Sequence, residues 1–85
     1  MPSFRDRVIF QVVQKVNGIP VASYICKRRQ VNSLETTVPK MILTDGRSVV
    51  FEIYEGLNGP QQRRGMPIQW EPRKVLVAGA DLQER

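Results

Sequence analysis

Two runs of β-branched and aromatic residues lie near the start of the chain, at residues 7–16 and 19–26. Neither run shows the 3.6-residue spacing of apolar positions that marks an amphipathic helix, so both are predicted to be strands. Asn17 and Gly18 separate them. Both residue types accept the positive φ angles of a two-residue type I′ turn, which predicts a β-hairpin.

The two-residue loop also sets the expected register of this hairpin. Phe10 then pairs with Ile25, and Val12 pairs with Ser23. One face is predicted to enter the core, and its residues are Val8, Phe10, Val12, Val16, Ile19, Val21 and Ile25. The other face is mixed and partly basic, and its residues are Arg7, Ile9, Gln11, Val13, Lys15, Ala22, Tyr24, Cys26 and Arg28.

A second hairpin is predicted where residues 38–44 and 47–55 flank Asp45-Gly46. Its expected register pairs Ile42 with Val49, and both of its faces then carry apolar side chains. Such a hairpin is covered on both sides or takes part in an oligomer contact. The residues predicted for that contact are Met41, Leu43, Val50 and Tyr54.

Two prolines predict which strands lie at the sheet edges. In these registers Pro20 pairs with Lys15 and Pro39 pairs with Glu52, both at positions without ladder hydrogen bonds. A proline there requires that no further strand bonds on its outer side. The strands at 19–26 and 38–44 are therefore predicted to be edges, with the other two hairpin strands nearer the centre.

The remaining segments complete the expected fold. Residues 27–36 are polar and are predicted to form a basic connector. Residues 73–78 end in the apolar run Val-Leu-Val-Ala and are predicted to be a buried final strand. The fold class is expected to be all-β, a small five-stranded antiparallel barrel or curved sheet built from two hairpins and a C-terminal strand. It is predicted as one domain over 1–85, with tails at 1–6 and 79–85 and a flexible basic loop at 56–66.

Composition argues against several kinds of chemistry. Cys26 is the single cysteine and histidine is absent, so neither a Cys/His zinc site nor a His-dependent nucleophile can be assembled. The acidic residues do not pair at a defined separation, and we expect no catalysis and no cofactor. The apolar runs are far shorter than a membrane span, and the N-terminal residues lead into no signal-type stretch, which predicts a cytoplasmic protein without a membrane partner.

Net charge brings nucleic acid into consideration. The chain has 13 basic and 8 acidic residues, a net charge of +5 and a pI near 10.0. Such an excess favours DNA or RNA, although many small basic proteins carry it for solubility alone. A tyrosine within a basic strip can also stack a base. The residues predicted to bind nucleic acid are Arg7, Lys15, Tyr24, Lys27, Arg28, Arg29, Arg63, Arg64, Arg73 and Lys74.

A second hypothesis is a structural or adaptor protein. It would self-associate as a homo-oligomer, or bind a protein partner, through its sheet edges and its doubly apolar second hairpin. The two hypotheses are compatible, because a dimer can also bind nucleic acid.

Overall fold

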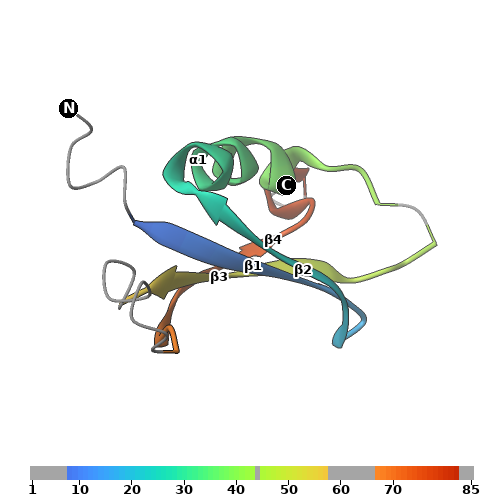
Figure 1. The fold of residues 1–85 in the computed structure, drawn as a ribbon. Helices are drawn as coiled ribbons and strands as arrows, with labels where there is room; N and C mark the ends of the chain where they lie inside the picture. The colour runs from blue at the N-terminus through green and yellow to red at the C-terminus, as the bar shows by residue number, and fades with distance from the viewer. Residues whose placement is uncertain (1–7, 44, 58–66, 83–85) are drawn as a thin grey trace.

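A four-stranded antiparallel sheet carries one helix on one of its faces (Figure 1). This arrangement comes from a computed structural model, which describes residues 8–43, 45–57 and 67–82. The strand order is β2-β1-β3-β4. The elements are β1 (Ile9–Val16), β2 (Ile19–Lys27), α1 (Arg28–Thr37), the 3₁₀ turn η2 (Val38–Lys40), β3 (Val49–Gly56), β4 (Trp70–Val77) and the 3₁₀ turn η4 (Ala80–Leu82).

The predicted fold class is confirmed only at its coarse level. The fold is mainly β and antiparallel, but the sheet has four strands and is not closed into a barrel. The sheet order confirms that β2 is an edge strand and that β1 and β3 are central. Most of the predicted basic loop, residues 58–66, lies outside the described residues.

The first hairpin forms at the predicted turn but in a different register. Asn17 and Gly18 have φ angles of 51° and 82°, as a type I′ turn requires. A bulge on β2 then shifts the pairing by one residue, so that Val12 pairs with Tyr24. Because side chains alternate along a strand, the shift exchanges the two faces of β2. Cys26 is buried, and Ile25, predicted for the core, is 58% exposed.

The predicted basic connector at residues 27–36 is instead a helix, α1. The side chain of Gln30 accepts a hydrogen bond from the backbone N–H of Lys27 at 3.0 Å, which satisfies one of the free donors at the helix N-terminus. Val31, Leu34 and Val38 recur at helical spacing and pack into the core. This narrow apolar stripe is sufficient to dock an otherwise polar helix on the sheet.

The predicted second hairpin does not form. Asp45 and Gly46 do adopt positive φ angles of 65° and 63°, but residues 41–43 are not a strand. Pro39 lies near the start of η2, which continues directly from α1, and Val38 is buried. The packing of this segment against the core takes the place of strand pairing, and β3 pairs with β1 and β4.

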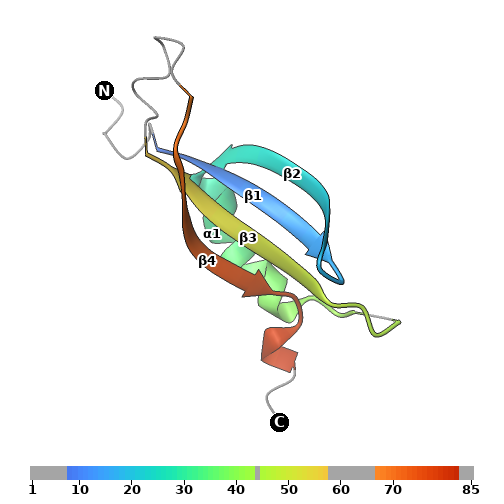
Figure 2. The ribbon, with the colours of Figure 1, turned by 90° about the horizontal axis from the view of Figure 1, so that it is seen from below.

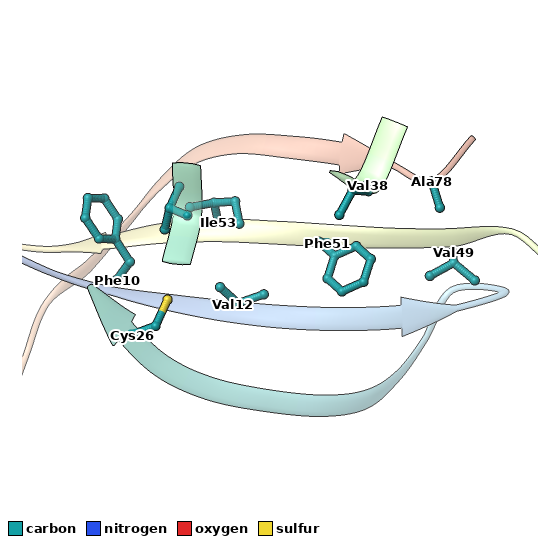
Figure 3. Packing of buried hydrophobic residues seen from close by; sticks show 9 residues of the cluster. Phe10, Val12, Cys26, Val38, Val49, Phe51, Ile53 and Ala78 are labelled. Atoms are coloured by element: carbon teal, nitrogen blue, oxygen red, sulfur yellow. The ribbon is translucent and has the colours of Figure 1, made fainter. Parts of the chain in front are cut away.

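The hydrophobic core lies between the sheet and the α1–η2 segment (Figure 3). It takes alternate residues from the central strands and joins them to the helix and to the residue that follows β4. Its buried members are Phe10, Val12, Cys26, Val31, Val38, Val49, Phe51, Ile53 and Ala78. The strand β4 is largely exposed, so the prediction that residues 73–78 are buried holds only for Ala78, with Leu76 partly buried.

Candidate functional site

The predicted nucleic-acid-binding residues do not form one surface. Arg7, Arg63 and Arg64 lie outside the described residues. Lys15 is on the side of the sheet away from α1, whereas Tyr24 pairs with Val12 and lies on the helix side. The basic strip containing a tyrosine that the first hairpin was expected to present is therefore absent from the described residues, because the bulge on β2 moves Tyr24 to the other face.

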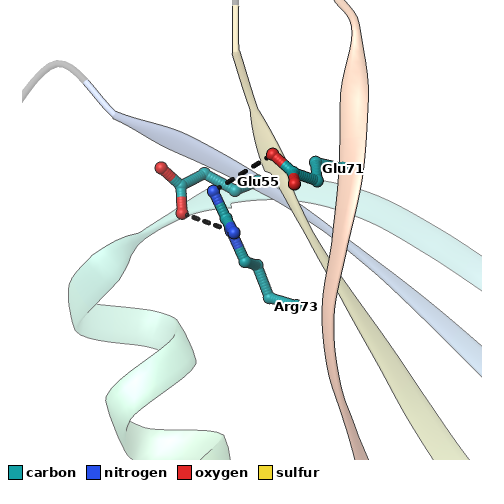
Figure 4. A network of polar contacts seen from close by, with 3 residues as sticks. All are labelled: Glu55, Glu71 and Arg73. Atoms are coloured by element: carbon teal, nitrogen blue, oxygen red, sulfur yellow. Dashed lines mark hydrogen bonds and ion pairs between the residues drawn. The ribbon is translucent and has the colours of Figure 1, made fainter.

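Three of the predicted phosphate contacts are held in ion pairs within the protein. Lys15 Nζ lies 2.8 Å from Glu52 Oε2, and Lys74 on β4 pairs with Glu35 on α1. Arg73, at a bulge in β4, contacts Glu55 at 2.9 Å and Glu71 at 3.2 Å (Figure 4). These pairs contribute little to stability because they are partly exposed, but they neutralise the cations that phosphate would have needed.

Lys27, Arg28 and Arg29 remain as a consecutive basic group at the start of α1. All three are exposed, and the first turn of the helix contains no acidic residue. The Arg28 guanidinium lies 4.7 Å from the centre of the Phe10 ring, a cation–π contact. Cations at a helix N-terminus face the positive end of the helix dipole, an unfavourable arrangement that an anion would relieve.

We call the side of the sheet away from α1 the uncovered face; it is turned toward the viewer in Figure 2. It carries several aliphatic residues. Val13, Val50, Val75 and Val77 lie on this face in neighbouring strands, with Val50 paired to Val77. Val75 and Val77 are 57% and 43% exposed. Val50, Val75 and Val77 are neighbours on two adjacent strands and form an apolar patch rather than isolated exposed residues.

The carboxylate of Glu52 lies among these valines and has two polar partners on the same face, Lys15 and Tyr54. Glu52 pairs with Val13 on one side and with Val75 on the other. Its carboxylate accepts a hydrogen bond from the Tyr54 hydroxyl at 2.8 Å and forms the ion pair with Lys15. The hydrogen bond and charge of Lys15, with the bond from Tyr54, lower the pKa of Glu52. The hydrogen bond to Glu52 and the charge of Glu52 raise the pKa of Lys15. The hydrogen bond to Glu52 is also the main cause that raises the pKa of Tyr54.

One end of the uncovered face has a small apolar cluster of its own. A Cβ built on Gly56 would lie 3.0 Å from Ile9 Cγ1, 3.2 Å from Ile68 Cγ2 and 3.3 Å from Trp70 Cζ3. These three side chains therefore close over the backbone of β3, and glycine is the residue that leaves room for them. The cluster fixes the start of β4 against the two central strands.

The predicted oligomer contact is divided by the fold. Val50 and Tyr54 lie on the uncovered face, whereas Leu43 packs against the core and Met41 lies outside the sheet. Val75 and Val77 are not among the predicted contact residues, because the apolar run that contains them predicts a buried strand. The sequence contains no period-two signal for this open face, because Val75, Leu76 and Val77 are all apolar; only their burial alternates.

Comparison with protein-family models, with curated proteins and with solved structures finds no match. Within the described residues, no helix is long and apolar enough to cross a membrane.

Proposed function

We propose that this protein is a non-catalytic structural module that assembles with further copies of itself through the uncovered face. One observation carries the proposal. The face combines exposed valines with a charged pair, Lys15 and Glu52, whose partners are already supplied by the same face. Burying an unpaired charge is strongly unfavourable, whereas a paired and hydrogen-bonded group can enter an interface at much lower cost.

The architecture of the sheet supports the same function. A sheet normally buries its apolar face against another layer, and here α1 supplies that layer on one side only. Removing a valine side chain from water contributes up to about 1.5–3 kcal/mol. Several adjacent valines in two facing sheets supply favourable energy against the entropic cost of association.

The test is the mass of the full chain in solution, measured by sedimentation velocity across a range of concentrations. The wild-type protein is expected to associate, and Val75→Asp with Val77→Asp to shift the equilibrium at least tenfold toward monomer. Ile42→Asp and Leu82→Asp are matched controls, because these residues are also exposed, at 82% and 49%, but lie outside the sheet. A monomeric wild type, or equal effects of both pairs, would contradict the proposal.

A second proposal, nucleic-acid binding, is favoured by the basic group at Lys27, Arg28 and Arg29. Three adjacent cations beside the positive end of α1 suit a phosphate backbone. Binding to a fluorescent oligonucleotide should weaken as salt rises, with a smaller salt dependence in Lys27→Ala/Arg29→Ala. Lys40→Ala/Arg47→Ala removes the same charge elsewhere and serves as the control. Equal losses in the two double variants would indicate attraction by net charge alone.

A further inference from the structure

The two edges of the sheet differ in their protection against pairing with another strand. The edge strand β4 contains the sequence Glu71-Pro72-Arg73-Lys74. Charged residues and proline are the devices by which proteins keep edge strands from recruiting other chains. The other edge, β2, has no charged residue from Ile19 to Cys26, and its proline and bulge lie near the turn. Residues 22–26 are left without such protection.

The backbone direction along β2 follows from a hydrogen bond at the end of β1. Asn17 donates its backbone N–H to the carbonyl oxygen of Ser48, at 2.7 Å, on the β3 side. The backbone N–H and C=O groups of successive residues in a central strand point alternately to its two neighbouring strands. Those of Val12 and the other even-numbered residues of β1 therefore point to β2. Their partners on β2 face back toward β1. Ser23 and Ile25 lie one residue to either side of Tyr24. Their backbone N–H and C=O groups therefore point away from β1, within the plane of the sheet, at its open edge.

We infer that β2 pairs antiparallel with β2 of a second copy, on a two-fold axis that passes beside Tyr24. Ser23 of each copy then exchanges backbone hydrogen bonds with Ile25 of the other. The two Tyr24 residues face each other as a non-hydrogen-bonded pair, in which side chains approach most closely. This inference rests on the proposed self-assembly and adds a second, backbone-mediated contact to it.

Charge and side-chain chemistry favour a second copy as the occupant of this edge. In the antiparallel arrangement, Lys27 and the basic residues after it lie at opposite ends of the paired strands, so like charges do not meet. On the helix side, the paired tyrosines extend the core outward from the buried Cys26. Because the axis is perpendicular to the sheet, the uncovered faces of both copies lie on the same side and form one larger surface.

Disulfide trapping of the full chain tests this register. In a Cys26→Ser background, Tyr24→Cys places two thiols opposite each other, with Cα atoms about 4.5 Å apart, close enough to bond. Ile25→Cys is the matched control, because each new thiol then lies opposite Ser23. Its two Cα atoms are separated by about 8 Å, too far for a disulfide. Under mild oxidation, Tyr24→Cys is expected to form covalent dimers at least ten times faster.

Equal rates for the two variants, or faster trapping of Ile25→Cys, would overturn the inference. If the wild type associates in the centrifuge but the Tyr24→Cys variant forms no covalent dimer, this inference is also overturned, whereas assembly through the uncovered face is not. A monomeric wild type without trapping would overturn both proposals. Ser23→Pro provides a second test, because it removes an outward N–H that the β1–β2 ladder does not use. It is expected to abolish trapping of Tyr24→Cys without changing the circular dichroism spectrum.

Discussion

The covered and uncovered faces of the sheet are built from alternate residues of the same strands. In β3, Phe51 and Ile53 lie beneath α1 and η2 and are buried, while Val50, Glu52 and Tyr54 alternate with them on the uncovered face. The strand is therefore apolar on both sides over part of its length. A sheet that met water on its uncovered side would ordinarily show a polar residue at the position of Val50, as it does at Glu52.

The two faces also place their ion pairs differently. On the covered side, Lys74–Glu35 and the contacts of Arg73 lie at the edge formed by β4 and leave the buried core free of charge. On the uncovered side, Lys15–Glu52 lies among the valines. A central, internally satisfied pair suits the proposed assembly through this face, where it would add specificity to apolar contact.

The largest expected effect comes from replacing a valine by alanine on the covered face, compared with the same replacement on the uncovered face. Val12→Ala removes two buried methyl groups beneath the helix and should lower the free energy of unfolding by about 2 kcal/mol. Val75→Ala, on the exposed part of the uncovered face, should change it by less than about 0.5 kcal/mol in the monomer. Urea denaturation at low protein concentration measures both. Equal losses would show that the uncovered face already has a packed layer on it.

Gly56→Ala should have the next largest effect and tests the small cluster on the uncovered face. The new methyl group would press on Ile9, Ile68 and Trp70, and the crowding should exceed the gain from replacing a strand glycine. The expected net destabilisation is about 1 kcal/mol, measured by thermal and urea unfolding. Adding Ile9→Ala should restore part of the loss, since it removes the nearest neighbour. A more stable Gly56→Ala protein would contradict close packing at this site.

Asn17 connects the two central strands, because it follows the end of β1 and bonds to Ser48, the residue before β3. Its side-chain oxygen accepts a hydrogen bond from the Ser48 backbone N–H at 2.9 Å, in addition to its role in the turn. Asn17→Gly keeps the positive φ angle but loses this acceptor, and should destabilise the protein by about 0.5–1 kcal/mol. Asn17→Asp retains an acceptor and should lose less. The same loss in both variants would assign the effect to the turn alone.

The smallest effect concerns the ion pair of the uncovered face. The folded pKa of Glu52 lies below its ordinary value, so the pair stabilises the protein fully above about pH 4.3, the usual pKa of glutamate. That contribution is lost as the pH falls through the lower folded pKa. Lys15→Met should raise the Glu52 pKa toward its ordinary value, and Tyr54→Phe should raise it less. Carboxyl-carbon NMR titration measures each shift, and an unchanged pKa in Lys15→Met would contradict the pairing.

Local signals in the sequence were sufficient for the turns and for the sheet order of the first strands. Asn17-Gly18 and Asp45-Gly46 adopt the positive φ angles that their residue types favour, and Pro20 lies on an edge strand. The bulge after Pro20 was not predictable, because an extra residue on β2 leaves no local pattern. That single residue reversed the expected positions of Tyr24 and Ile25, and with them the candidate site.

Tertiary context decided the remaining elements. The apolar stripe of α1 is narrow, and its helical character depends on the sheet beneath it. β3 pairs with β1 rather than with the predicted strand at residues 38–44, because Val38 instead packs into the core. The ion pairs of Lys15 and Lys74 join residues 37 and 39 positions apart in sequence, distances over which charge patterning gives no guide.

The bond between Asn17 and Ser48 spans 31 residues, and this separation has a consequence for the order of folding. The β1–β2 hairpin closes a loop of two residues and can form within microseconds. Pairing of β1 with β3 has to close a far longer loop, at a greater cost in chain entropy. Until then, β1 is itself an edge strand, and a newly synthesised chain carries two unprotected edges rather than one.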